Sequence, residues 1–185
     1  MINIQEKKVF QVNGWLILVV VIALTVIGFN ILIHREREAE LPLQTVVAIV
    51  LLLIAALSGP GFFIIHPNES KVFTFLGKYV GSARVPGFHW TNPFAAKKKI
   101  TLRIFNLNSE TIKVNDAAGN PIEIAAVIVW HVVDSAKALF NVEHYENFVT
   151  IQSETAIRQL ASHYPYDSHE KDQESLRANQ ESIAA

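Results

Sequence analysis

The sequence predicts an α+β protein in which an N-terminal pair of membrane-spanning helices is followed by β-strands and then by further helices. Two uncharged, apolar runs of 25 residues each, Val9–Ile33 and Leu41–Ile65, occupy the first third of the chain. Partly alternating apolar residues follow them, and apolar residues at helical spacing come last. The length of 185 residues suggests one or two domains.

The first run has Trp15 near its start, where an interfacial aromatic residue would lie. Either run can cross a hydrocarbon core of ~30 Å at ~1.5 Å per residue. Two buried helices of a soluble protein would need polar faces, which these runs lack. A cleaved signal peptide is suggested by Lys7 and Lys8, but the run is too long and no A-x-A-like site follows it.

The two runs are joined by a short charged link, "HREREAE", which predicts a helical hairpin whose ends lie on one side. The second helix, Leu43–Leu57, is expected to stop at "SGPG", because Pro60 cannot donate a backbone hydrogen bond and glycines favour a turn. Phe62–Ile65 then either dips into the interface or begins the first strand. A re-entrant second segment is the alternative to a spanning hairpin.

Basic residues near the spans predict the orientation. The link has two arginines among three glutamates. The outer flanks carry more basic residues, namely Lys7, Lys8, Lys71, Lys78, Arg84 and Lys97 to Lys99. We therefore expect a multi-pass protein of the cell (inner) membrane, with both termini and the following domain on the cytoplasmic side.

The region after His66 is predicted to form strands. Val72, Phe73 and Phe75 are typical strand residues, and Ile100, Leu102 and Ile104 are expected on one face of a further strand. The stretch from Ile112 to Val133 predicts a hairpin around the turn "NDAAGNP". Its second arm, Ile122–Val133, is nearly continuously apolar, which favours a strand covered on both faces.

Helices are predicted after Asp134, a suitable N-cap for "SAKALFN". The next helix is expected from Val142 to Tyr164 and ends at "PYD". Its expected apolar stripe consists of Tyr145, Phe148, Val149, Gln152, Thr155, Ala156 and Gln159. A polar helix is expected to begin after Asp167, and because it has no terminal signal at "ESIAA" we expect a longer protein.

Charge is segregated along the chain. Residues 66–104 carry seven Lys or Arg against one acid, whereas residues 105–185 carry five against twelve. A basic segment next to a membrane attracts anionic headgroups by roughly 1 kcal/mol per residue. Anionic membrane lipid is therefore the expected partner, in preference to nucleic acid.

No enzymatic motif is present. The sequence has no phosphate loop, G-x-S-x-G elbow or H-E-x-x-H, and it has no cysteine. A hydrolase using Ser153 or Ser162 with His144 or His163 is the enzymatic alternative, but solvated helix-surface residues explain this pattern more simply. We expect no catalytic residue, cofactor or metal.

Five segments, in order, resemble the SPFH or band 7 domain of the stomatin, prohibitin and flotillin superfamily. They are "FLGKYVG", "PGFHWTNPF", the D-x-x-G-x-P-I-x-I hairpin, "VVDSAKALFNV" and the helix ending in "YPYD". The resemblance covers Phe62 to about Ala185, and the stomatin-like (slipin) branch is the most similar. It implies a curved antiparallel sheet packed by helices.

The resemblance also implies a function. Family members are membrane-associated scaffolds, not enzymes, and they assemble into rings or cages that organise a membrane patch. Some hold a membrane protease or channel within it, so an adaptor or regulator of such a partner is the alternative function. Many relatives have a single anchor or a re-entrant hairpin, whereas this sequence has two full-length apolar runs. The family's second subdomain and coiled coil would follow Ala185.

The densest cluster of rings and turn formers is "RVPGFHWTNPF", Arg84–Phe94. A packed β-corner and a membrane-surface anchor are both compatible with it, and a ligand pocket is the weaker alternative. The residues expected to face lipid are Trp15, Phe62, Phe63, Phe88, Trp90, Phe94, Lys97, Lys98 and Lys99. Glu154 and Arg158, an i, i+4 pair, are expected to contribute oligomer contacts, although a surface ion pair is the ordinary interpretation.

The expected organisation has six parts. They are a cytoplasmic segment (1–14), a first transmembrane helix (15–33), a loop (34–42), a second transmembrane or re-entrant helix (43–61), the first SPFH subdomain (62–167) and the start of a further helix (168–185).

Overall fold

The structure is a computed structural model, and it describes residues 5–34, 43–167 and 175–177. The chain forms two compact units: unit 1 comprises Met1–Arg103 with Val133–Lys137, and unit 2 comprises Ile104–Val132 with Ala138–Ala185. The α+β class is confirmed, since antiparallel sheets and helices follow an N-terminal pair of apolar helices. Most of the expected loop 34–42 and of the expected helix 168–185 lies outside the described residues.

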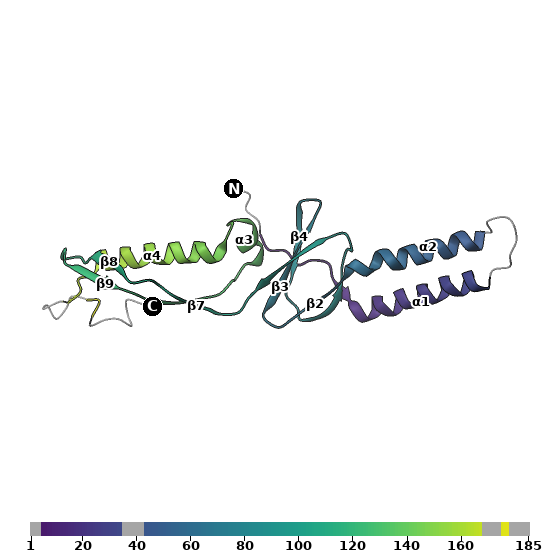
Figure 1. Cartoon of the computed structure of the whole chain (residues 1–185), viewed down its shortest axis with the longest axis horizontal. Coiled ribbons are helices and arrows are strands. Elements are labelled where there is room, and N and C mark those ends of the chain that lie inside the picture. Colours follow the sequence, from purple (N-terminus) through teal and green to yellow (C-terminus); the bar gives the residue numbers. More distant parts are fainter. Residues whose placement is uncertain (1–4, 35–42, 168–174, 178–185) are drawn as a thin grey trace. The chain divides into compact units, whose positions relative to one another are not determined.

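Helices α1 (Gly14–Ile33) and α2 (Leu43–Ser58) of unit 1 lie side by side (Figure 1). The Oδ1 of Asn13 accepts a hydrogen bond of 3.0 Å from the amide of Trp15 and so caps the start of α1. Gly28 lies at the contact between the helices, where an added Cβ would come within 2.9 Å of Leu52 Cγ. Small residues of this kind allow two apolar helices to approach closely.

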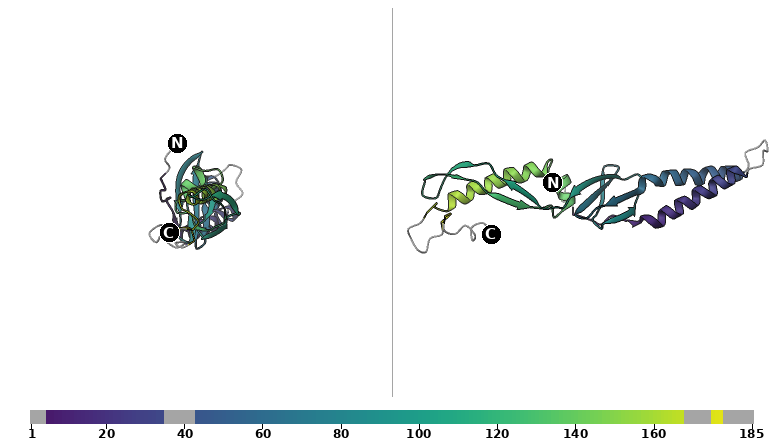
Figure 2. Two further views of the ribbon diagram at one scale, coloured as in Figure 1. Left: turned by 90° about the vertical axis from the view of Figure 1, so that its left-hand side faces the viewer. Right: turned by 60° about the horizontal axis from the view of Figure 1, so that its bottom comes forward.

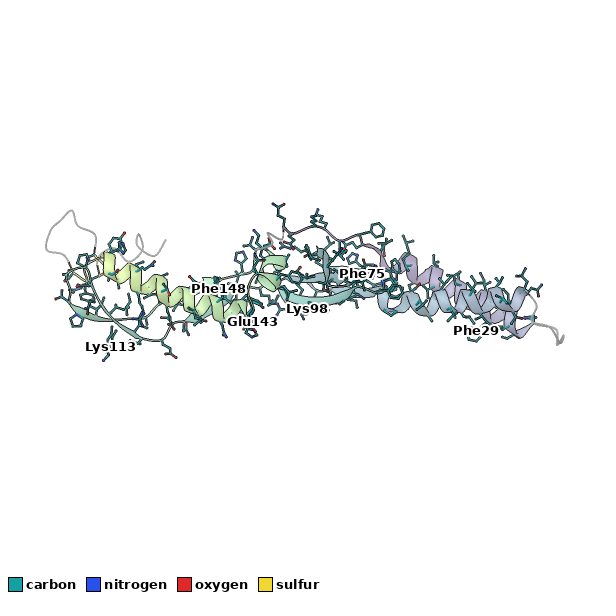
Figure 3. All side chains as sticks on the ribbon, turned by 90° about the horizontal axis from the view of Figure 1, so that it is seen from above. Phe29, Phe75, Lys98, Lys113, Glu143 and Phe148 are labelled. Carbon is teal, nitrogen blue, oxygen red and sulfur yellow. The ribbon has the colours of Figure 1, made fainter. Side chains whose placement is uncertain are left out.

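The two helices are long and apolar enough to cross a membrane. Only 6% of the Gly14–Ile33 window and 17% of the Leu43–Gly61 window are buried in the structure. The described residues of this chain therefore do not cover the two helices as they would cover the core helices of a soluble protein. Phe29 is one of many exposed apolar side chains on the pair (Figure 3).

The helix pair adjoins a three-stranded antiparallel sheet in the order β1 (Val12–Asn13), β5 (Gly87–Trp90), β2 (Phe62–Ile65). A 3-10 turn, η1 (Gly59–Gly61), connects α2 to β2. "FFII" therefore forms a strand, and the segment "RVPGFHWTNPF" supplies the central strand of this sheet.

The second sheet of unit 1 has the order β4 (Lys78–Ala83), β3 (Glu69–Phe75), β6 (Ala96–Thr101). The N-terminal segment extends along the free edge of β4, where Val9 N donates to Ser82 O at 3.1 Å and Ser82 N donates to Lys7 O at 2.7 Å. Pairing of this kind covers an edge that would otherwise be open to other strands. Buried apolar residues form the core of the unit: Val9, Phe63, Ile65, Phe73, Ala83 and Ala95.

The expected strand face of Ile100, Leu102 and Ile104 is wrong. Strand β6 ends at Thr101, and the amide of Leu102 donates to Asn68 O at 2.8 Å. Ile100 is buried, whereas Ile104 is 71% exposed. The chain turns away from the sheet at this point, so the alternation does not continue.

Unit 2 contains a long, interrupted antiparallel hairpin (Figure 2). Strand β7 (Phe105–Asn108) pairs with β10 (Val127–Trp130), and β8 (Ile112–Asn115) pairs with β9 (Pro121–Ile124). The predicted hairpin is confirmed, but its second arm is not one strand, because Ala125–Ala126 separate β9 from β10. The expected burial of both faces is also wrong: Val127 is 68% exposed.

The tip of this hairpin is fastened by one carboxylate. Asp116 Oδ1 accepts from the amides of Ala118 (3.0 Å) and Asn120 (2.7 Å), and its Oδ2 accepts from the amide of Tyr166 (3.0 Å). Gly119 has a φ of 84°, which only glycine adopts easily. The "NDAAGNP" and "YPYD" segments are thus held together.

Helix α3 comprises Ser135–Phe140, and Asp134 caps it as predicted by accepting from Lys137 N at 2.9 Å. Helix α4 comprises Tyr145–His163 and begins three residues later than expected. Most of its expected apolar stripe is wrong, because Phe148, Gln152, Thr155, Ala156 and Gln159 are exposed, and only Tyr145 and Val149 are half-buried. The buried residues are instead Ile157 and Ala161, one turn apart.

Candidate functional site at the base of the helix pair

The ends of the two apolar helices meet the β1-β5-β2 sheet without a linker. Helix α1 begins directly after β1, and only the three residues of η1 separate α2 from β2. In the antiparallel register, Val12 and Phe62 both lie opposite Trp90, and Ile64 lies opposite Phe88. Directly opposed residues project to the same face, so Phe62, Phe88 and Trp90 gather where the helices start, whereas Phe63 lies on the other face.

Three rings form a continuous contact at this place. Trp15 packs edge-on against Phe88 with centroids 5.3 Å apart, and Phe88 stacks on Phe62 at 5.4 Å with an interplanar angle of 8°. Gly14 lies against the same ring, since an added Cβ would come within 2.6 Å of Phe88 Cδ1. These rings attach the first turn of α1 to the sheet.

The other helix end is fastened by hydrogen bonds. The indole Nε1 of Trp90 donates to Ser58 O at 3.0 Å, and the ammonium of Lys97 donates to Pro60 O. The last carbonyl groups of a helix have no partner within it, and a positive charge near them is favourable. Sheet side chains thus satisfy acceptors that an apolar surrounding would leave unpaired.

Lysines surround an open groove beside this attachment. The groove has a volume of about 400 Å³ and is lined by Phe62, Phe63, Ile64, His66, Glu69, Lys71, Phe88 and Lys99. In the register of β3 and β6, Lys71 lies opposite Lys99 and Phe73 lies opposite Lys97. These residues therefore share one face, whereas Lys98, opposite Val72, projects from the other.

The charges in the groove are partly paired. Lys99 Nζ lies 2.6 Å from Glu69 Oε1, and its hydrogen bond holds the pKa of Glu69 below the usual range. Lys71 and Lys97 each place Nζ 5.9 Å from the centroid of the Phe63 ring. Burial, followed by the nearby charge of Lys71, lowers the pKa of Lys97.

The structure brings together most of the residues predicted to face lipid. Trp15, Phe62, Phe88 and Trp90 lie at the helix ends, and Phe94 is 66% exposed. Phe63 differs, because it is 5% exposed and packs on Phe73 with centroids 4.9 Å apart. Phe63 is therefore a core residue, and its expected exposure to lipid is corrected.

The three consecutive lysines do not act as one patch. Lys97 and Lys99 lie on one face of β6 and Lys98 on the other, and of the three only Lys99 lines the groove. Sequence reasoning did not connect Glu69 and Lys71 with this site. The signal that could have found them is the alternation of β3, which places Glu69, Lys71 and Phe73 on one face.

Unit 2 has its own hollow, an apolar groove of about 800 Å³. Its lining residues are Ile124, Ala125, Ala126, Val127, Ile128, Val129, Ser153, Ala156, Ile157, Leu160 and Leu176. Ser153 lies there, but neither His144 nor His163 lines this groove. Within the described part of the chain, no group of three His, Cys, Asp or Glu residues could hold a metal ion.

The sequence model of the SPFH domain / Band 7 family matches residues 63–184, which is more than half of the chain. The chain belongs to the SPFH domain / Band 7 family. Proteins of this family are membrane-associated scaffolds and are generally not enzymes. No curated protein matches the sequence. The match begins at Phe63 in β2, so the SPFH domain starts within the sheet to which the helices are attached.

Proposed function

We propose that this chain is a membrane-anchored scaffold of the stomatin-like type, whose homo-oligomeric rings or cages organise a membrane microdomain and its resident proteins. The observation that carries the proposal is the direct attachment of the apolar helices to the first sheets of the SPFH domain, within unit 1. Trp90 and Lys97 bind the end of α2, and Phe88 packs on the start of α1. The position of these sheets therefore determines the position of the helices.

In this proposal the helix pair spans the cell (inner) membrane as a hairpin, and the domain lies on the cytoplasmic side. Trp15, Phe62, Phe88, Trp90 and Phe94 then lie at headgroup level, where amphipathic aromatic residues are favoured. The carbonyl oxygens of Ser58 and Pro60 at the end of α2 support this placement. They already accept hydrogen bonds from side chains and therefore need no water.

Self-association supplies the scaffold. Symmetric repetition multiplies weak contacts of each subunit with lipid. The described residues contain no ion pair between Glu154 and Arg158 on α4, so both charges can pair across a subunit contact. We propose them as oligomer contacts.

Electron microscopy of the full chain, purified in detergent, tests the scaffold. A closed ring or cage is the expected result, and a small monodisperse oligomer would contradict it. Crosslinking in the membrane identifies the neighbours. A membrane protease recovered in stoichiometric amount would favour an adaptor that regulates the protease, whereas recovery of self-contacts alone favours the scaffold.

A further inference from the structure

The groove beside β2 concentrates positive charge at one place. Lys71 and Lys97 approach the same ring, and Lys99 lies opposite Lys71 in the β3–β6 register. Glu69 is the one acid among the groove-lining residues. Two ammonium groups, those of Lys71 and Lys99, line the groove against this one carboxylate, and the ammonium of Lys97 approaches the Phe63 ring. An anion would compensate this excess of positive charge.

Lys71 and Lys97 carry like charges close to one another. Burial chiefly lowers the pKa of Lys97, and the charge of Lys71 lowers it further. Lys97 is held by the carbonyls of Pro60 and Phe62, the second at 3.4 Å. These two neutral carbonyls hold the ammonium of Lys97 in place, but they do not cancel its positive charge.

A second, independent feature is the free acceptor of Glu69. This residue is 6% exposed, and its Oε2 has no hydrogen-bond partner, although its Oε1 is paired with Lys99. An unpaired carboxylate oxygen at a buried position is unfavourable. A ligand for this groove therefore offers an anionic group to the lysines and a hydrogen-bond donor to Glu69.

The groove also lies close to the helix ends. Phe62 and Phe88, which line it, belong to the ring contact with Trp15. Lys97 binds the carbonyl of Pro60, and Lys99 lies about 7 Å farther along β6. If α1 and α2 cross a bilayer, this groove lies at the depth of the headgroups.

We propose that the groove lined by Lys71, Lys99 and Glu69 is a specific site for the headgroup of an anionic phospholipid that carries hydroxyl groups, such as phosphatidylglycerol. The phosphate binds between Lys71 and Lys99, and a headgroup hydroxyl donates to Glu69 Oε2. This inference deepens the proposed scaffold function and depends on the helix pair being in a membrane. It does not depend on ring formation.

Calorimetric titration of the full chain in neutral detergent tests the site. The probes are short-chain phosphatidylglycerol, phosphatidylethanolamine and phosphatidylcholine, together with glycerol 3-phosphate and inorganic phosphate. Phosphatidylglycerol is expected to bind most tightly, with an affinity that falls as salt rises. Equal affinity for phosphatidylcholine would overturn the site, and equal affinity for free phosphate would overturn its assignment to lipid. Tighter binding of an acidic peptide would assign the groove to a protein partner instead.

Variants locate the site. Lys71→Gln and Lys99→Gln are each expected to weaken phosphatidylglycerol binding about tenfold, the loss typical of one charge-assisted contact. Lys98→Gln removes a lysine charge from β6, as Lys99→Gln does, but from the other face of the sheet. The affinity of this variant for phosphatidylglycerol is therefore expected to stay unchanged. Equal losses in all three variants would overturn the site in favour of a diffuse basic surface. Lys71→Arg keeps the charge and is expected to retain most of the affinity.

Glu69→Gln tests the hydroxyl contact. This variant is expected to reduce the preference for phosphatidylglycerol over phosphatidic acid, which lacks the headgroup hydroxyls. An unchanged preference would overturn the role of Glu69. Electron microscopy of the same preparations separates the two proposals. If rings form but lipid binding is not selective, the groove proposal is rejected. If lipid binding is selective but no rings form, the scaffold proposal is rejected.

Discussion

The indole Nε1 of Trp90 lies 3.0 Å from the carbonyl oxygen of Ser58, 32 residues earlier in the chain. This hydrogen bond joins the last turn of an apolar helix to the central strand of the first SPFH sheet. Together with the ring contact between Trp15 and Phe88, it makes the helix pair and the sheet one structural element.

Trp90→Phe removes the donor and keeps an aromatic ring. The carbonyl of Ser58 then loses its partner, so we expect the free energy of unfolding to fall by about 1 to 2 kcal/mol. Thermal unfolding in detergent measures the change. Trp15→Phe is the matched control, because the contact of Trp15 is made through its ring. Equal losses in both variants would show that the hydrogen bond is not the cause.

The turn η1 contains two glycines with different surroundings. A Cβ on Gly61 would collide with Trp90 Nε1 and would lie 2.6 Å from Thr91 O, whereas a Cβ on Gly59 has no atom within 4 Å. We expect Gly61→Ala to destabilise unit 1 by about 1 to 3 kcal/mol, typical of overpacking, and Gly59→Ala to have a small effect. Equal effects in thermal unfolding would contradict the close approach of η1 and β5.

Leu76, at the tip of the β3–β4 hairpin, has a φ of 47° and is 85% exposed. A left-handed conformation is unfavourable for leucine by roughly 1–2 kcal/mol and is much easier for asparagine. Leu76→Asn is therefore expected to stabilise the protein by about 1 kcal/mol in denaturant unfolding. Leu76→Ala keeps the unfavourable backbone and removes the side chain, so a similar gain from alanine would rule out relief of backbone strain as the cause.

Asp116 makes unit 2 sensitive to acid. The amide of Tyr166 chiefly holds the pKa of Asp116 below its usual range, and the amides of Asn120 and Ala118 contribute. A carboxyl with a depressed folded-state pKa contributes stability above its unfolded pKa, and this contribution is lost as pH falls through the folded pKa.

We therefore expect Asp116→Asn to lower stability at neutral pH and to flatten the loss of stability on acidification. Hydrogen exchange of the β8 and β9 amides, measured as a function of pH, reports this locally. Glu123→Gln, which removes an exposed carboxylate on β9, is the control. If hydrogen exchange in the Asp116→Asn protein depends on pH in the same way as in the unmodified protein, this role of Asp116 is contradicted.

The proposed oligomer contact is tested by charge reversal. Glu154→Lys and Arg158→Glu are each expected to shift the assembly toward smaller species in size-exclusion chromatography. If the two charges pair across subunits, the double variant restores the pairing and the assembly. Unchanged elution of both single variants would remove these residues from the contact.

Local patterns predicted much of this fold, because they depend on neighbouring residues. The apolar runs, the Asp134 cap and the hairpin turn at "NDAAGNP" are of this kind. The pairing of strands does not depend on neighbouring residues. Strand β5, for example, lies between β1 and β2, which are both distant from it in sequence. The stripe of α4 was misplaced because its buried residues are few, and helical spacing alone did not distinguish Ile157 from Ala156.

The candidate site was partly predictable for the same reason. Aromatic residues and lysines mark it in the sequence, but their faces depend on register. Lys97 to Lys99 were expected to act together, and the β3–β6 pairing separates Lys98 from its neighbours. Glu69 and Lys71 join the site only through that pairing.

Labelling of single cysteines with a membrane-impermeant maleimide tests the spanning hairpin most directly. The sequence has no cysteine, so a single introduced thiol is read without background. His34→Cys lies at the far end of α1, and Lys78→Cys lies in the SPFH domain. We predict labelling of His34→Cys in intact cells and of Lys78→Cys only after lysis. Labelling of both thiols in intact cells, or of neither before lysis, would contradict a hairpin that crosses the membrane.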